Sequence, residues 1–287
     1  MILAYIIVLM FGLIVGSFLG VCIYRLPKDE SIISPPSHCT SCNKPLAWFD
    51  NIPIISFIVL RGKCRYCKNP ISSKNLLVEL ISGALTVYLF SRFGYSLNFV
   101  LGMIFFSSLI VASFIDYKYQ IIPDSVSVGA LILIFIIKTI QSFGTCGNIM
   151  QKPIVVSVGG AIFAAGMVYL IIIIFNFILF DVIATIYKKR GKVFYLLKKF
   201  DNEDEASCMG LGDVTLMALI GALLGAQGAL ITFIIAPFIG SIVGIVILVT
   251  KKDHIIPYGP FLSLAALVVF IWQDQIIATA SNFLCGI

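Results

Sequence analysis

Long apolar stretches constrain this chain more than any other feature. A helix that crosses a bilayer needs roughly 17–25 predominantly apolar residues, because the hydrocarbon core is about 30 Å thick. Eight stretches have approximately this length and character, at about 2–24, 76–91, 97–115, 125–141, 154–180, 211–226, 229–250 and 260–280. Only 12% of the residues are charged, whereas a soluble domain has roughly a quarter. The sequence therefore predicts an all-α polytopic membrane protein with about eight transmembrane helices.

Basic residues predict which ends of these helices face the cytosol. The first stretch lacks a basic leader and ends at Arg25, so we interpret it as a retained helix rather than a signal peptide. With the N-terminus outside, the inner segments hold 17 Lys and Arg residues and the outer segments hold three. Inner loops of membrane proteins carry such an excess. The net charge of +6 then faces anionic lipid, and no other feature supports nucleic-acid binding.

Four cysteines mark the cytosolic segment 25–75. They form two C-x-x-C pairs, Cys39 with Cys42 and Cys64 with Cys67, separated by 21 residues. Doubled pairs at such spacing are typical of tetrahedral zinc sites. Disulfides are disfavoured in the reducing cytosol. The sequence predicts a small zinc-ribbon-like loop, with unliganded thiols or a redox pair as the alternatives.

Two carboxylates lie beside the apolar stretches and are the candidate catalytic residues. Asp116 ends the third stretch, and Asp213 begins the sixth in the sequence Gly210-Leu-Gly212-Asp213. The predicted topology places both at the cytosolic face, although they are far apart in sequence. Charge near a bilayer core is costly, so it indicates function. Two aspartates that share a proton can act as the base and the acid of a protease. The structural alternatives are a helix-terminal charge for Asp213 and a boundary residue for Asp116.

Neighbouring residues have expected supporting roles. Gly210 and Gly212 allow close backbone approach and an unusual turn before the sixth helix. Asp124, which follows Pro123, competes with Asp116, but its position predicts an N-cap or first-turn acid of the fourth helix. Glu79, early in the second stretch, is either a boundary charge or part of a polar site.

The remaining cysteines carry weaker predictions. Cys22 lies in the first apolar stretch and fits an apolar filler, and Cys208 is a lone cytosolic thiol. Cys146 and Cys285 both fall on the outer side, where disulfides form. A bond between them is therefore a hypothesis, since sequence gives no distance between the two residues.

At this point the chain resembles the bacterial type IV prepilin peptidases, the leader peptidase/N-methyltransferases, over nearly its whole length. Six collinear motifs carry the resemblance: Gly16 to Pro27, Ser37 to Ser72, Leu77 to Gly83, Asp116 with Ile122-Pro123-Asp124, Gly210 to Asp213, and Ile256 to Phe261. Three positions depart from the family pattern. Gly20 replaces a frequent Asn, Lys74-Asn75-Leu76 replaces a basic-Tyr-Pro sequence, and Thr215 replaces a frequent Lys.

The resemblance implies an aspartyl endopeptidase of the bacterial inner membrane whose active site and cysteine loop face the cytosol. It implies cleavage after the glycine that ends the leader of prepilins and pseudopilins, with Asp116 and Asp213 as the catalytic pair. It also implies methylation of the new N-terminal amine by S-adenosylmethionine, with the four cysteines as the zinc-associated tetrad. No glycine-rich nucleotide motif is present, and Glu79 is the candidate at the methyl-donor site. The chain would then divide into a first helix at 1–24, a zinc-binding, methylation-associated loop at 25–75 and a membrane-embedded peptidase core at 76–287.

Three other functions stay open at this point. The first is a peptidase without methylation, against which the four cysteines argue. The second is a transporter or channel that uses the two aspartates as proton or cation ligands. Neither an inverted repeat nor a midplane broken helix supports it. The third is a non-catalytic scaffold that binds partners through its zinc loop.

Overall fold

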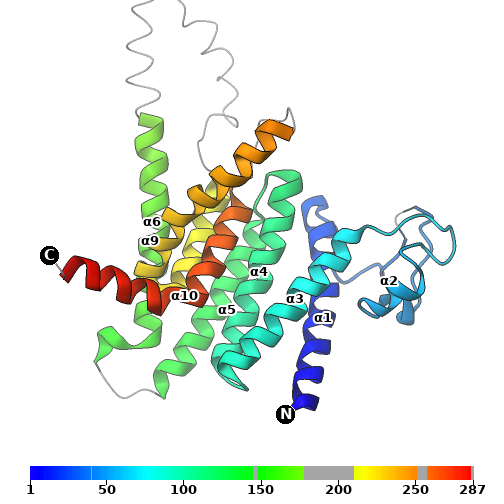
Figure 1. The fold of residues 1–287 in the computed structure, drawn as a ribbon, viewed down its shortest axis with the longest axis horizontal. Helices are drawn as coiled ribbons and strands as arrows, with labels where there is room; N and C mark the ends of the chain where they lie inside the picture. The colour runs from blue at the N-terminus through cyan, green and yellow to red at the C-terminus, as the bar shows by residue number, and fades with distance from the viewer. Residues whose placement is uncertain (40, 145–147, 178–209, 251–256, 286–287) are drawn as a thin grey trace, which may run out of the picture.

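The computed structural model describes residues 1–39, 41–144, 148–177, 210–250 and 257–285, and these residues are helical apart from loops (Figure 1). The long helices are α1 (Ile2–Arg25), α3 (Ser73–Phe93), α4 (Leu97–Tyr119), α5 (Asp124–Phe143), α6 (Pro153–Phe177), α9 (Leu211–Thr250) and α10 (Gly259–Cys285). The short ones are η1 (Leu26–Lys28), η2 (Trp48–Asn51), α2 (Ile55–Val59) and η3 (Ile149–Gln151). Among the described residues, six helices are long and apolar enough to span a bilayer: α1, α3, α4, α5, α6 and α9. Helix α10 adds a shorter apolar stretch, Gly259–Trp272. The predicted all-α multi-pass architecture is confirmed.

A bend in α9 accounts for two of the eight predicted spans. Gly225 has φ 73° and ψ 178° inside this 40-residue helix, so the helix changes direction there. Glycine adopts positive φ without the steric cost that a side chain would add. The prediction of two spans, 211–226 and 229–250, therefore corresponds to the two parts of α9 on either side of Gly225.

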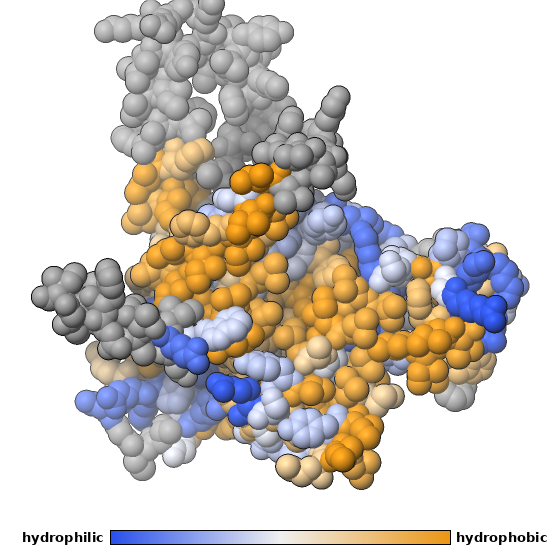
Figure 2. Space-filling view, viewed as in Figure 1, coloured by the Kyte–Doolittle hydropathy of each residue, from blue (hydrophilic) through white to orange (hydrophobic). Residues whose placement is uncertain are grey.

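The outer surface of the bundle is apolar, as a lipid-facing surface should be. Figure 2 shows hydrophobic residues over most of the visible helical surface, with hydrophilic residues gathered on the cysteine loop and at the opposite end of the helices. Large side chains such as Phe11, Ile132 and Phe238 are more than half exposed. No water is available in a bilayer core to solvate polar groups, so exposed apolar side chains are the stable choice there.

Two apolar cores hold the bundle together. The larger one unites α4, α5, α6, α9 and α10 around side chains such as Phe105, Ile134 and Leu262, each fully buried. The smaller one joins α1, α3 and α4 through Leu19, Val78 and Ile115. Helix α4 contributes to both cores, so its end is fixed relative to every helix that carries a candidate site residue.

The end of α4 and the start of α5 determine the positions of Asp116 and Asp124. Helix α4 ends at Tyr119, where Gln120 takes a left-handed conformation with φ 57° and donates its N–H to the Asp116 carbonyl. Pro123 then serves as the N-cap of α5, a position that suits proline because no helical N–H is lost. Asp116 consequently lies in the last turn of α4, and Asp124 is the first residue of α5, as predicted for a first-turn acid.

Candidate active site and metal centre

Asp116 is buried and is held by the start of the last helix. Its side chain is 7% exposed. The backbone N–H of Gly259, the first residue of α10, donates a hydrogen bond of 2.8 Å to Asp116 Oδ2. A β-carbon built on Gly259 would lie only 2.7 Å from the same oxygen. Glycine is therefore the residue that lets the α10 backbone approach this carboxylate.

Asp213 has a similar arrangement at the start of α9. Its side chain is 8% exposed, and the Gly210 N–H donates to Asp213 Oδ2 at 3.1 Å. The Asp213 N–H in turn donates to the Gly210 carbonyl at 3.0 Å. The first of these bonds is one half of a capping box: the Asp213 side chain accepts the N–H of the residue before the helix, whereas Gly210 has no side chain to make the second half. Capping uses one carboxylate oxygen and does not conflict with a role for the other.

The two aspartates and Tyr258 belong to one cluster. Asp116 acts electrostatically on Asp213. Burial, together with the nearby Asp213 carboxylate, raises the pKa of the Tyr258 hydroxyl to about 12. Tyr258 therefore stays neutral over any physiological pH. The structure thus brings together residues from the ends of α4, α9 and α10, as the predicted topology required for the two aspartates.

Asp124 is connected to this cluster but lies at its edge. Its Oδ1 accepts a hydrogen bond of 3.0 Å from the Thr215 hydroxyl, which also lies 3.0 Å from the Gly212 carbonyl. Thr215 is the position where a lysine was expected from the family resemblance. The threonine hydroxyl supplies a donor to Asp124 here, and it links the start of α5 to the start of α9.

The two glycines before Asp213 differ in their surroundings. A β-carbon on Gly212 would lie 2.8 Å from Ile122 Cβ and 3.1 Å from the Ile122 carbonyl oxygen. On Gly210 the nearest atom would be the Gly212 nitrogen, at 3.9 Å, which is an ordinary contact. The expected close backbone approach thus occurs at Gly212, whereas Gly210 contributes its N–H.

The cysteine loop between α1 and α3 contains two turns of matching geometry. In the first turn, the Cys39 N–H donates to the Lys44 carbonyl, and the Asn43 N–H donates to the Cys39 carbonyl. In the second turn, the Cys64 N–H donates to the Asn69 carbonyl, and the Lys68 N–H donates to the Cys64 carbonyl. An isolated β-bridge closes each turn, between His38 and Pro45 and between Lys63 and Pro70. Both turns carry a positive φ directly after their second cysteine, 54° at Asn43 and 60° at Lys68.

The four cysteine sulfurs converge between these turns. All four lie within 4.8 Å of one another, and the sulfurs of Cys39 and Cys67 are 3.8 Å apart. Four thiolates around a tetrahedral Zn²⁺ at about 2.3 Å would be about 3.8 Å apart. Backbone N–H groups of Ser41 and Cys42 lower the pKa of the Cys39 thiol to about 6, which favours the thiolate that binds metal. The cluster fits a metal ion.

Polar contacts stabilise the cysteine loop internally and connect it to helices α1 and α3. Arg65 makes an ion pair with buried Asp50: Nη2 donates to Asp50 Oδ1 at 2.7 Å, and Nε lies 3.0 Å from Oδ1 and 3.2 Å from Oδ2. Buried Arg25, at the end of α1, donates to the carbonyls of Ser31 and Pro35 at 2.8 Å and 2.7 Å. Glu79 of α3 accepts the Ile54 N–H at 2.9 Å, so Glu79 joins the loop backbone to the membrane helices.

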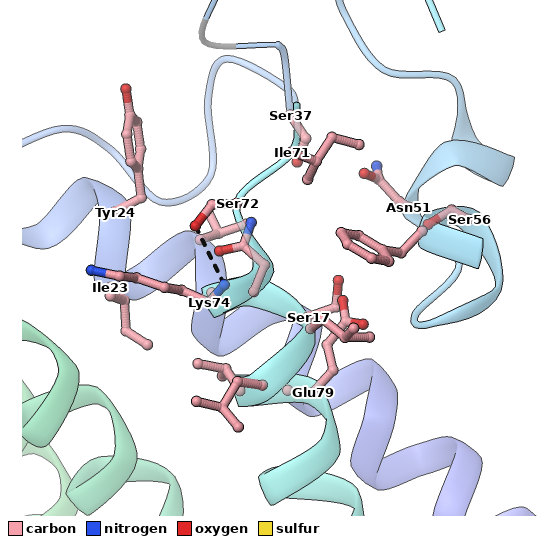
Figure 3. A pocket seen from close by; sticks show the side chains of 18 of the residues that line it. Ser17, Ile23, Tyr24, Ser37, Asn51, Ser56, Ile71, Ser72, Lys74 and Glu79 are labelled. Carbon is pink, nitrogen blue, oxygen red and sulfur yellow. Dashed lines mark hydrogen bonds between the residues drawn. The ribbon is translucent and has the colours of Figure 1, made fainter. Parts of the chain in front are cut away.

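A cavity of about 1090 Å³ lies between the loop, α1 and α3, and extends to α4 and the start of α10. Figure 3 shows Ser17 and Glu79 at the end nearest α3, facing Asn51 and Ser56 of the loop across the open space. The sequence placed Glu79 at the second helix but gave no partner for it. Sequence reasoning also assigned no role to Ser17, Gly259 or Tyr258. For the last two, the signal was the motif Ile256 to Phe261, which carried the resemblance without a role for any of its residues.

Some predicted features fall outside the described residues. Cys146 and Cys208 belong to undescribed segments, and the side chain of Cys285 is not described either. The hypothesis of a bond between Cys146 and Cys285 therefore stays a prediction.

Comparison with known proteins covers almost the whole chain. Residues 10–93 match the bacterial peptidase A24 N-terminal domain, and residues 103–245 match the type IV leader peptidase family. The prepilin leader peptidase/N-methyltransferase of Stutzerimonas stutzeri is 31% identical, over 96% of this chain and 93% of that protein. The proteins of the same name from Legionella pneumophila and Neisseria gonorrhoeae are 30% and 29% identical, over 95% and 92% of this chain and 93% and 89% of their own lengths. No solved structure matches it. The chain belongs to the type IV leader peptidase family.

Proposed function

We propose that this protein removes the leader peptide of type IV prepilins and pseudopilins and then methylates the new N-terminal amine with S-adenosylmethionine. One observation carries the proteolytic part: two buried carboxylates from separate helices, Asp116 and Asp213, lie at one end of the bundle and interact electrostatically. A backbone N–H fixes one oxygen of each. The relatives' names and the family match support both activities for this chain.

The geometry suits the chemistry of an aspartyl protease. Two carboxyl groups that repel each other hold a single proton between them. The ionised aspartate accepts a proton from water as the water oxygen attacks the scissile carbonyl. The protonated aspartate donates its proton to the carbonyl oxygen and later helps the amine to leave. The hydrogen bonds from Gly259 and Gly210 hold both groups in place before substrate arrives, which reduces the cost of reorganisation.

The position of the pair suits a substrate anchored in the membrane. Asp116 ends α4 and Asp213 begins α9, so the reacting bond would lie where a transmembrane helix leaves the bilayer. The excess of basic residues in the segments at this end supports a cytosolic orientation in the bacterial inner membrane. We propose that cleavage occurs on this face, after the glycine that ends the leader.

The cysteine cluster supports zinc as the structural metal of the loop. Four cysteine ligands suit Zn²⁺, and a loop of this size has little apolar core of its own, so a bound metal would supply folding free energy. The residues that would hold it are Cys39, Cys42, Cys64 and Cys67. Zinc content of the purified protein tests the assignment. Substitution of Cys67 with Ser should remove most of the metal, and Cys22→Ser in α1 should leave it unchanged.

The alternatives have less support. A peptidase without methylation would have no use for a four-cysteine loop attached to the bundle by Glu79. A transporter would place its charged ligands at the bilayer midplane, whereas both aspartates lie in end turns of their helices. A scaffold would not need two buried carboxylates in one cluster.

Mass spectrometry of a type IV prepilin co-expressed with this protein tests the proposal. We expect loss of the leader and a gain of one methyl group with the wild type, and uncleaved prepilin with Asp116→Asn or Asp213→Asn. Leader loss without a methyl group would support the peptidase alone. A prepilin that stays intact with the wild type, although inserted in the membrane, would contradict the proteolytic function.

A further inference from the structure

A short apolar helix in the cysteine loop exposes most of its large side chains. Helix α2 has the sequence Ile-Ser-Phe-Ile-Val, and Ile55, Ile58 and Val59 are 51%, 66% and 68% exposed. The spacing of these residues, i, i+3 and i+4, places them on one face of the helix. The side chains between them, Ser56 and Phe57, line the cavity between the loop and the bundle. An apolar face therefore points away from the protein, which is the reverse of the arrangement in a soluble domain.

A hydrogen bond fixes the depth of α2 relative to the membrane helices. The N–H of Ile54, the N-cap of α2, donates to Glu79 Oε2 at 2.9 Å. Glu79 lies about 9 Å along α3 from its first residue, Ser73. Helix α3 has 21 residues, so its length of about 31 Å is close to the thickness of the hydrocarbon core. Helices that lie in the membrane interface bury their apolar face about 5–10 Å deep, so α2 begins at the depth of an interfacial helix.

The position of α2 beside the bundle agrees with this depth. Figure 1 shows α2 at the side of the bundle, level with α1 rather than beyond its end. In Figure 2, hydrophobic surface covers the part of the loop where α2 lies and continues onto the membrane helices, whereas the hydrophilic residues of the loop lie on its other side. The exposed face of α2 is thus continuous with the surface that the bundle presents to lipid.

Basic residues follow α2 directly in the sequence. Arg61, Lys63 and Lys68 are all exposed, and none of them belongs to an ion pair within the part of the chain that the structure describes. Anionic lipid headgroups attract Lys and Arg side chains that lie close to the membrane surface. An apolar helical face accompanied by positive charge is typical of segments that bind an anionic bilayer surface.

We propose that α2 anchors the cysteine loop in the bilayer. Its exposed face lies among the acyl chains of the leaflet on the loop's side, and the three basic residues after it bind the headgroups of anionic phospholipids. This anchoring is independent of the proposed catalytic activities, because exposure, depth and charge alone support it. The loop is then held at two points, by the bilayer and by the bond from Ile54 to Glu79. Since Ser56 and Phe57 line the cavity, the anchor also fixes one of the cavity walls.

Photocrosslinking of the full-length protein tests the apolar contact. The protein is placed in nanodiscs of phosphatidylethanolamine and phosphatidylglycerol, with p-benzoylphenylalanine in place of Ile58. The same replacement of Phe11, more than half exposed on α1, should label lipid. The same replacement of Glu30, exposed beyond the end of α1, should not. We expect phospholipid adducts at position 58 with a yield comparable to that at position 11. Gel filtration and melting temperature show whether each variant folds.

Deuterium uptake by segment 55–60 tests the contact with headgroups. Wild-type uptake should be slower in phosphatidylglycerol nanodiscs than in phosphatidylcholine nanodiscs, a comparison that needs no variant. Lys63→Gln and Lys68→Gln should each raise the rate about fivefold in the anionic nanodiscs, and should leave it unchanged in the neutral ones. Lys152→Gln, which removes a charge before α6 at the opposite end of the bundle, is the matched control and should change neither rate.

Lipid adducts at position 58 together with slower uptake in anionic nanodiscs would support the anchor. Adducts on a second copy of this chain instead of lipid would overturn it, because the face would then be a protein interface. The absence of adducts at position 58, while position 11 labels lipid, would overturn it as well. Equal uptake in the two lipids would overturn the contact with anionic headgroups. None of these results depends on leader cleavage or methylation, so the proposed function stands or falls separately.

Discussion

Substitution of Gly259 with alanine should slow leader cleavage without unfolding the protein. The new β-carbon would lie 2.7 Å from Asp116 Oδ2 and 3.2 Å from Asp116 Cγ. Ordinary contact begins near 3.4 Å, so the carboxylate and α10 must separate by about 0.7 Å. Alanine keeps the backbone N–H, so the change displaces the donor and the carboxylate rather than deleting the hydrogen bond.

The magnitude follows from that displacement. Misplacing a catalytic group by about 1 Å costs about 100-fold in rate. We therefore expect kcat/KM to fall by about 10- to 100-fold, equivalent to about 1.4–2.7 kcal/mol of activation free energy. The assay is cleavage of a purified prepilin in detergent or nanodiscs, followed by gel shift, with the melting temperature of each variant measured in parallel.

Other glycines of the chain supply matched controls. Gly129→Ala on α5 meets no atom within 4 Å, and Gly210→Ala meets only the Gly212 nitrogen at 3.9 Å. Both should retain cleavage within about threefold of the wild type, since neither displaces a carboxylate. Gly212→Ala, which meets Ile122 Cβ at 2.8 Å, should be impaired like Gly259→Ala. Normal activity in Gly259→Ala, or an equal loss in Gly129→Ala, would refute the steric reasoning.

Three further substitutions test contacts away from the aspartates. Thr215→Val removes the hydroxyl that donates to Asp124 at 3.0 Å, so it should destabilise the protein by about 1 kcal/mol, and Thr215→Ser should restore the melting temperature. Arg65→Met leaves buried Asp50 without its ion-pair partner, so it should lower the free energy of unfolding by about 1–3 kcal/mol. Limited proteolysis should then cut the cysteine loop faster than in the wild type, and an unchanged rate would contradict this. Gly12→Ala puts a β-carbon 2.5 Å from Thr86 Oγ1, so α1 and α3 must separate at a cost of about 1–3 kcal/mol, visible as a lower melting temperature in detergent.

The sequence was sufficient for features that depend on local pattern. Apolar length located the spans, and the break between the sixth and seventh predicted spans falls close to the observed bend at Gly225. The two C-x-x-C pairs located the cysteine cluster, because that motif fixes its ligands over a short stretch. Topology alone placed Asp116 and Asp213 at one end of the bundle, since helix direction alternates from span to span.

Contacts between distant segments could not be read from the sequence. The Gly259 N–H reaches Asp116 across 143 positions, and no pattern in either segment encodes that distance. The link between Asp124 and Thr215 arises in the same way, from α5 and α9 meeting at their first turns. The sequence left Glu79 open between a boundary charge and part of a polar site, because its partner, the Ile54 N–H, is a backbone group that any residue would supply.

The hydrogen bond from Gly259 to Asp116 also bears on when the protein becomes active during its synthesis. Asp116 and Asp213 are both made and inserted before the α10 segment follows them. Until α10 packs against α4, the buried carboxylate of Asp116 lacks its backbone donor, and the first of the two proposed catalytic groups is not yet fixed. Proteolytic capacity should therefore appear only when the last described helix has docked, so a partly inserted chain would be harmless to neighbouring membrane proteins.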